Sequence, residues 1–196
     1  IVSISDTSKI PPSDVLLQEH INLDWDTQYF DTRRSRVLNK HARYNLCYGN
    51  LDQEPDYPNK KGRIIGWHHI PLTKFIHQQL PHYVGYKANQ MQLEGNLYYN
   101  TSKCGIGFHG DSERKRVIAL RLGESNPLHY QWYYKSQPVG EMVKLQLNSG
   151  DMYILSEKAR GFDWKRRNIL TLRHAAGCNK YVTLKNKYFQ VDLKKN

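Results

Sequence analysis

An imidazole and a carboxylate lie two residues apart in His109-Gly110-Asp111, and this pair has the clearest potential for chemistry in the chain. On a β-strand, residues i and i+2 project from the same face, so both side chains can contact one metal ion. Imidazole nitrogen and carboxylate oxygen are common ligands of divalent transition metals. The pair therefore predicts two of the three protein ligands of a metal site.

Two later histidines could supply the third ligand. His129 lies inside the candidate strand 128–133 and is expected to face a neighbouring strand. His174 follows several further candidate strands and precedes Ala175, Ala176 and Gly177, whose small size leaves room for a cosubstrate. We predict His174 as the third ligand. Two histidines and one carboxylate form a facial triad, whose open iron positions accept a keto acid and O₂.

Short apolar segments separated by Gly, Asn and Ser dominate the chain after residue 90. Their spacing is typical of an antiparallel sandwich or barrel. Before residue 90, apolar residues at 72, 75, 76 and 80 predict a helix that ends at Pro81. The predicted fold is mainly β with flanking helices (α+β), around a double-stranded β-helix or jelly-roll core. The predicted strands are 93–99, 117–122, 128–134, 142–147, 151–155, 169–174 and 181–191.

The length of 196 residues suits one domain over 1–196, with N-terminal helices in about 1–90 and the jelly roll in about 91–193. Three widely spaced cysteines without a C-x-x-C pair predict neither a disulfide framework nor a structural zinc site. This fits a reducing, intracellular compartment, either nucleus or cytoplasm. No apolar run reaches the length of a membrane span, and we expect a soluble monomer.

Basic residues outnumber acidic ones, with 29 Lys and Arg against 18 Asp and Glu and a net charge of +11. Such an excess favours a polyanionic partner, and nucleic acid is the leading candidate. Phosphate contacts could flank the metal pair, because one basic cluster follows Asp111 and another precedes His174. The basic clusters fall within 33–43, 60–63, 114–116 and 165–167.

Several motifs surround the metal pair. Asn96-Leu97-Tyr98-Tyr99, followed by Ile-Gly-Phe-His-Gly-Asp-Ser-Glu at 106–113, has the pattern N-x-Y…H-x-D-x-[DE]. Residues 150–156 read as a G-D turn and apolar strand, and residues 43–49 as an aromatic and basic loop. With these motifs, residues 36 to 190 resemble the AlkB-like branch of the Fe(II)/2-oxoglutarate-dependent dioxygenases.

The resemblance implies roles for residues outside the triad. Tyr99 would hydrogen-bond 2-oxoglutarate, with Tyr98 as the alternative and Asn96 beside them. Glu113 falls where the family places a carboxylate near the substrate base, although a solvated Glu opposite Arg114 is an equal alternative. Segment 43–49 would form the lid over the substrate nucleotide. Its contact residues would be Arg43, Tyr44 and Tyr48.

The chain departs from the family pattern at the cation that holds the distal carboxylate of 2-oxoglutarate. Family members carry an arginine after the third histidine, whereas here Lys185 would supply the charge, in competition with Lys180 and Lys187. A second register makes Asp163 the third ligand, with Arg167 and Arg173 as the arginine pair. We prefer His174, because the two-histidine ligand set is closer to the chemistry than the identity of the cation.

The resemblance implies an enzyme that uses Fe(II), 2-oxoglutarate and O₂ to hydroxylate or demethylate a methylated base. The base would be flipped or single-stranded, since a stacked base cannot reach a buried metal. DNA and RNA, repair and programmed modification, and N-methyl and C-methyl substrates all stay open. Two alternatives are a protein or small-molecule hydroxylase and a non-catalytic nucleic-acid-binding jelly roll. Candidate stacking residues are Tyr44, Tyr48, Trp67 and Trp164.

Overall fold

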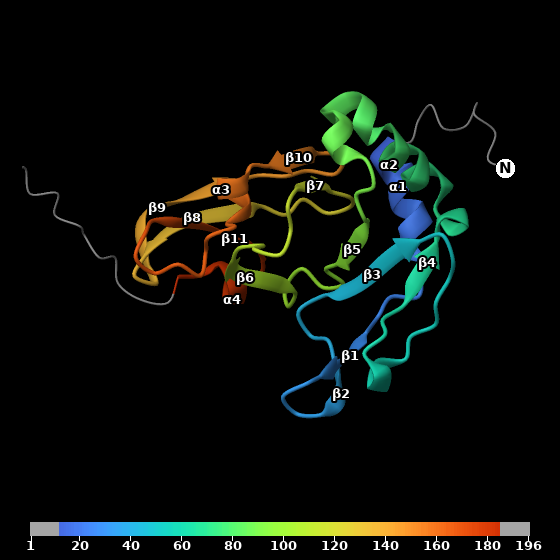
Figure 1. The fold of residues 1–196 in the computed structure, drawn as a ribbon, viewed down its shortest axis with the longest axis horizontal. Coiled ribbons are helices and arrows are strands. Elements are labelled where there is room, and N and C mark those ends of the chain that lie inside the picture. The colour runs from blue at the N-terminus through green and yellow to red at the C-terminus, as the bar shows by residue number, and fades with distance from the viewer. Residues whose placement is uncertain (1–11, 185–196) are drawn as a thin grey trace, which may run out of the picture. The chain divides into compact units, whose positions relative to one another are not determined.

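The computed structural model describes residues 12–184, which divide after Tyr99 into two compact units. We had expected one domain with a change of texture near residue 90. Both units contain β-sheets and helices, so the fold is mainly β with a few helices, as predicted (Figure 1). No helix within residues 12–184 is long and apolar enough to cross a bilayer.

The first unit is built around a three-stranded sheet in the order β4-β3-β5. Strand β3 (Tyr44–Gly49) runs parallel to β4 (Ile64–Gly66) and antiparallel to β5 (Glu94–Leu97). Strands β1 (Gln28–Asp31) and β2 (Arg36–Asn39) form a separate hairpin. The buried residues Leu46, Tyr48, Ile65 and Ile70 form the core of this unit. Residues 12–90, where we expected helices and a lid, therefore contain four strands, β1 to β4, whereas β5 lies within the predicted strand 93–99.

Two α-helices, α1 (Pro12–Ile21) and α2 (Pro71–Val84), lie side by side in this unit (Figure 1). The α2 N-terminus has no capping side chain of its own. Glu19 of α1 caps it instead, because its carboxylate accepts hydrogen bonds from the backbone N–H groups of Leu72 and Thr73 at 2.6 and 2.9 Å. Short 3₁₀ helices are η2 (Tyr57–Asn59), η3 (Trp67–His69) and η4 (Tyr86–Ala88).

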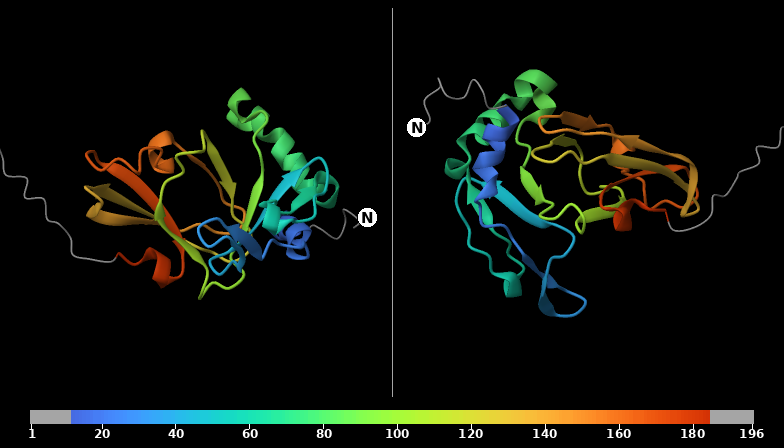
Figure 2. Two further views of the ribbon diagram at one scale, coloured as in Figure 1. Left: turned by 60° about the horizontal axis from the view of Figure 1, so that its bottom comes forward. Right: turned by 180° about the vertical axis from the view of Figure 1, so that it is seen from behind.

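The second unit contains a four-stranded antiparallel sheet in the order β6-β11-β8-β9 and a two-stranded sheet of β10 and β7 (Figure 2). Leu128, Tyr130 and Ala176 of the larger sheet pack against Tyr153 and Leu155 of β10, so an apolar core lies between the sheets. Its elements are β6 (Gly105–His109), β7 (Val117–Leu120), β8 (Leu128–Tyr134), β9 (Gln137–Leu145), β10 (Met152–Leu155), α3 (Glu157–Arg160), β11 (Thr171–Gly177) and α4 (Asn179–Val182).

Two local predictions are wrong. Helix α2 continues through Pro81 to Val84. Pro81 stands in the last turn, where the missing N–H removes one hydrogen bond and the φ of proline still suits a helix. The predicted strand 181–191 begins inside helix α4, and its residues from 185 onward lie outside the described residues.

Candidate metal centre

His109, Asp111 and His174 converge in the second unit, with ligand atoms that all lie within 4.8 Å of one another. Nε2 of His109 is 3.7 Å from Oδ1 of Asp111, and Nε2 of His174 is 3.5 Å from Oδ2. The rings of the two histidines meet edge to face, with centroids 4.4 Å apart. His174 is buried and the other two residues are half-buried. The arrangement presents two nitrogens and one carboxylate to one point.

The sheet register creates this convergence. Strands β6 and β11 are antiparallel neighbours, and His174 pairs directly with His109. Directly opposed residues project from the same face of a sheet, so the two imidazoles meet although they are far apart in sequence. The ladder shifts register next to His174, between His174 and Ala176, which marks a local irregularity at the site.

The backbone of Asp111 is fixed by Arg160, the last residue of helix α3. Its N–H donates to the carbonyl oxygen of Arg160 at 2.9 Å, and the buried guanidinium of Arg160 donates to the Asp111 carbonyl oxygen at 2.6 Å. These reciprocal bonds hold the carboxylate beside the end of β6. Arg160 was not predicted, because the contact joins residues 49 apart and no local pattern signals it.

Hydrogen bonding orients the His109 ring. Nδ1 of His109 lies 2.8 Å from the carbonyl oxygen of Gly107, which can only accept, so Nδ1 carries a proton. The lone pair of a neutral His109 is therefore on Nε2, the atom that faces Asp111. A neutral imidazole binds a metal ion through such a lone pair.

The pKa of Asp111 reflects opposing effects. Burial raises the pKa of this carboxyl, but the hydrogen bond with His174 and the charges of His174, His109 and Arg114 together hold it below its ordinary value. Burial also raises the pKa of Tyr130 to about 12, with smaller contributions from Tyr153 and Asp111. Tyr130 pairs with His174 on β8, so a protonated hydroxyl belongs to the face that carries the triad.

The structure brings neither alternative ligand to the pair. His129 is buried on β8 and pairs with Ala175 on β11, so it projects from the face opposite to that of Tyr130. Asp163 is 5% exposed, and its Oδ2 lies 2.7 Å from Nζ of Lys158. The carboxylate of Asp163 therefore has a lysine as its partner and stands apart from the histidines.

The predicted cations do not meet the triad in the described residues. Arg173 precedes His174 on β11, so its side chain projects from the opposite face, where its guanidinium lies 4.1 Å from the ring centroid of Tyr133 and 5.4 Å from that of Trp164. The prediction that Arg173 binds the cosubstrate at this triad is therefore wrong. Lys180 lies on α4, with Nζ 5.5 Å from the ring centroid of Tyr181. Lys185 and Lys187 lie outside the described residues.

Three residues that we predicted to bind the cosubstrate, Asn96, Tyr98 and Tyr99, belong to the first unit. Asn96 accepts hydrogen bonds from Arg43 and Asn45 at 2.7 and 2.6 Å, which ties β5 to β3. The Tyr99 hydroxyl donates to the His41 carbonyl oxygen at 3.2 Å. Tyr98 is half-buried beside it.

The predicted lid is the central strand of the first unit, not an exposed loop. Tyr48 is 8% exposed, lies 3.0 Å from the imidazole of His20 and packs near Trp67, so the prediction that it stacks on a base is wrong. Tyr44 stacks on Tyr99 with centroids 4.2 Å apart. Trp164, in the second unit, packs against the Gly110 backbone and Arg173.

Two clusters of charged residues lie between Asp111 and His174 in the chain. Glu113 is exposed in the loop after Asp111, together with the basic residues at 114–116. Nε of Arg114 lies 4.0 Å from Oδ1 of Asp111, so this cluster begins beside the candidate metal centre. The basic cluster at 165–167 is also exposed, and it directly follows Trp164.

No family model matches the chain. It is similar to an uncharacterized protein of Acanthamoeba polyphaga mimivirus, with 51% identity over 170 residues that make up 87% of this chain. The aligned region makes up 66% of that relative, so the chain spans just under two thirds of the relative's length. The comparison shows similarity to a viral protein whose function is not described. The chemistry of this chain must therefore be inferred from the candidate site.

Proposed function

We propose that the second unit binds Fe(II) through His109, Asp111 and His174 and, with 2-oxoglutarate and O₂, oxidises a methyl group on a nucleic-acid base. The observation that carries the proposal is the convergence of these three side chains from β6, the loop after it and β11. Two imidazoles and one carboxylate are the ligand set of the facial triad, which leaves three octahedral positions for other molecules.

The donor atoms suit a borderline transition metal. Imidazole nitrogen favours such an ion over Mg²⁺ or Ca²⁺, and one carboxylate contributes the negative charge. The carboxylate turns one oxygen toward each histidine, at 3.7 and 3.5 Å. A cation between these atoms would also neutralise the contact between Asp111 and the Nε2 lone pair of His109.

The surrounding sheets are consistent with a jelly roll. A four-stranded and a two-stranded antiparallel sheet enclose the apolar residues around Leu128, Tyr130 and Ala176. The triad projects from the same face as Tyr130, since His174 pairs with it. Ligands bound there would lie between the two sheets, where apolar side chains exclude water.

We propose Arg121 as the residue that binds the distal carboxylate of 2-oxoglutarate. Hydrogen bonds from Arg121 N–H to Asp151 and from Gly150 N–H to Arg121 extend the β7–β10 ladder by one residue. By strand alternation, its side chain projects from the same face as Ala119, the partner of the core residue Tyr153. Nε of Arg121 is buried and has no hydrogen-bond partner among residues 12–184. A carboxylate would satisfy it with a charge-assisted bond.

When bound, the iron and 2-oxoglutarate would supply the oxidising chemistry, and the protein would orient and shield it. The Tyr130 hydroxyl can donate a hydrogen bond to a cosubstrate oxygen, because its pKa of about 12 keeps it protonated. The exposed basic residues at 114–116 and 165–167 would hold phosphates near the site. A base in a duplex would have to leave its stack to reach the ligands.

The decisive experiment is anaerobic titration of the protein with Fe(II) and 2-oxoglutarate, followed by aerobic incubation with methylated DNA and RNA and mass spectrometry of the nucleosides. We expect one Fe(II) at the triad, succinate formation and loss of methylated nucleosides or appearance of hydroxymethyl ones. His174→Ala should abolish iron binding and turnover, because it removes one of three protein ligands.

The matched control is His129→Ala. It removes an imidazole that is similarly buried, 5% exposed against 7%, from the neighbouring strand. Iron binding should survive this change. Equal loss in both variants would mean that the effect is structural, and retained turnover in His174→Ala would refute the ligand set.

Arg121→Gln tests the proposed carboxylate partner separately. We expect the half-saturating 2-oxoglutarate concentration to rise by at least about tenfold, the equivalent of about 1.4 kcal/mol, while Fe(II) affinity stays unchanged. Unchanged 2-oxoglutarate dependence would assign the carboxylate to another cation, and the iron proposal would stand.

A further inference from the structure

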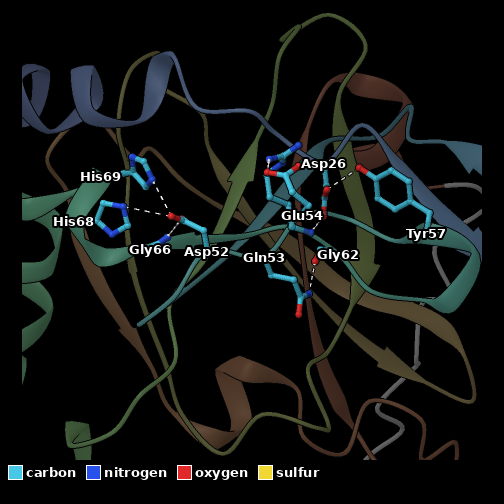
Figure 3. A network of polar contacts seen from close by, with 10 residues as sticks. Asp26, Asp52, Gln53, Glu54, Tyr57, Gly62, Gly66, His68 and His69 are labelled. Carbon is cyan, nitrogen blue, oxygen red and sulfur yellow. Dashed lines mark hydrogen bonds and ion pairs between the residues drawn. The ribbon is translucent and has the colours of Figure 1, made fainter.

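Asp52, His68 and His69 form a second cluster of ligand atoms in the first unit (Figure 3). Nε2 of His68 and Nε2 of His69 each lie 3.3 Å from Oδ2 of Asp52. These contacts join the loop after β3, which carries Asp52, to helix η3, which carries both histidines. The three ligand atoms lie within 4.8 Å of one another, as they do in the triad of the second unit.

The backbone around the cluster is held in place by buried neighbours. Ile65, at 7% exposed, and Ile70, at 0%, lie on either side of the segment that carries both histidines. Trp67 begins that segment and packs against Tyr48 and His77. The two imidazoles therefore project into solvent from a rigid turn, with ring centroids 4.1 Å apart.

Gly66 orients two of the three ligands. Its N–H donates to Oδ1 of Asp52 at 2.6 Å, which leaves Oδ2 to face the histidines. A Cβ at Gly66 would lie 2.6 Å from the His68 ring and 3.1 Å from Oδ1 of Asp52, so the absence of a side chain lets both groups approach the backbone. Figure 3 shows the carboxylate between this N–H and the two rings. The carboxylate is positioned with one oxygen for the backbone and one for a ligand.

The distances from the two imidazoles to Asp52 fit a metal site, whereas the ion pairs alone would add little to the stability of the first unit. Zinc bonds of about 2.1 Å at the tetrahedral angle place neighbouring ligand atoms about 3.4 Å apart. Both contacts to Oδ2 are 3.3 Å. Exposed ion pairs contribute little to stability, and these side chains are 45–63% exposed. Exposure also admits an ion and leaves its fourth position to water.

We propose that Asp52, His68 and His69 bind a divalent transition ion of the zinc type, distinct from the iron of the second unit. The two nitrogens and one oxygen select such an ion over Mg²⁺ and Ca²⁺. The ion links the loop after β3 to the turn that precedes α2, so binding stabilises the first unit. The site is independent of the proposed oxidation.

The test uses the whole 196-residue chain without a histidine tag, in the His109→Ala, His174→Ala background, so that the triad cannot bind metal. Zn²⁺ is titrated in competition with a chromophoric chelator, and Co²⁺ absorption in the visible range reports the geometry. We expect one ion per chain, a tetrahedral Co²⁺ spectrum and a higher melting temperature with Zn²⁺. Absence of a stoichiometric ion in this background would overturn the proposal.

Variants assign the ion to the cluster. His68→Ala with His69→Ala should abolish binding, and Asp52→Asn, which keeps an acceptor for the Gly66 N–H, should weaken it at least about tenfold, since even loss of a group that only supports a ligand costs about 10–100-fold. His82→Ala removes another exposed histidine of the same unit and should change nothing. Equal weakening by His82→Ala, or full binding without His68 and His69, would overturn the assignment.

Discussion

Gly110 separates the two candidate ligands of the H-x-D pair, and the space around it requires a glycine. A Cβ at this position would collide with the carbonyl oxygen of Gly161 and lie 2.7 Å from the Trp164 ring. Backbone atoms cannot rotate away, so Gly110→Ala should displace Asp111 from the histidines. We expect loss of Fe(II) binding and a fall of about 1–3 kcal/mol in unfolding free energy, measured by metal titration and urea denaturation.

Gly107, on the preceding strand β6, provides the matched control. A Cβ there would meet only the Tyr181 carbonyl oxygen, at 3.8 Å, which is ordinary van der Waals contact. Gly107→Ala should therefore leave both iron affinity and stability close to those of the wild type. A Gly110→Ala protein that binds Fe(II) normally would show that the pair tolerates this displacement, and the packing argument would fail.

Among the secondary-structure elements, we predicted from the sequence the strands that local periodicity signals. We did not predict the strand that depends on contacts with residues distant in the sequence. Strands β7, β8 and β10 lie within or match predicted segments, because alternating apolar residues signal a half-buried strand. Residues 43–49 carry the same signal, but a motif resemblance led us to expect an exposed lid. Their burial depends on the parallel pairing of β3 with β4, which no local pattern reveals.

The proposed triad shows the same division. The spacing of His109 and Asp111 was sufficient to predict that the two side chains lie together, and the small residues after His174 favoured it over His129. The face of Arg173 depends on strand alternation relative to His174, and its assignment as a cosubstrate ligand ignored that. No motif pointed to Arg121, because its position follows from the register of β7 and β10 and from the hydrogen bonds that continue it.

The contact between α1 and α2 gives the first unit a pH-dependent stability. His20 lies 3.0 Å from the Tyr48 hydroxyl and 2.9 Å from the Thr73 hydroxyl, and burial lowers the pKa of His20 below 6.5 despite the opposing effect of Glu19. The folded protein thus keeps His20 neutral at pH values where the unfolded chain binds a proton. Its contribution to stability is complete above pH 6.5 and declines as the pH falls from 6.5 toward the lowered folded pKa.

His20→Gln should remove this dependence. At about pH 7.5, we expect the variant to lose about 1 kcal/mol of unfolding free energy with its hydrogen bonds. At about pH 5.5, the difference from the wild type should shrink, by at most about 1.4 kcal/mol per pH unit between the two pKa values. Urea titrations at both pH values measure it, with His82→Gln as the exposed control. A difference that grows at low pH would contradict the sign of the shift.

For the whole molecule, the charge of +11 is the property that a nucleic-acid substrate would exploit. Exposed basic residues at 165–167 directly follow Trp164, whose ring packs on the Gly110 backbone beside the triad. Phosphates bound there would lie close to the proposed iron. A nucleic-acid substrate would therefore depend on this cluster more than on exposed basic residues elsewhere.

Lys165→Gln, Arg166→Gln and Arg167→Gln together should therefore weaken binding to single-stranded DNA or RNA. Each phosphate contact contributes about 0.7 to the slope of log affinity against log salt, so the slope should fall by up to about 2. Fluorescence anisotropy over a salt series measures it. The control replaces three exposed lysines of equal total charge, Lys74, Lys87 and Lys103. Equal changes in both triple variants would make the attraction a property of net charge alone, and no change in either would remove nucleic acid as the substrate while the Fe(II) site could still serve another methylated molecule.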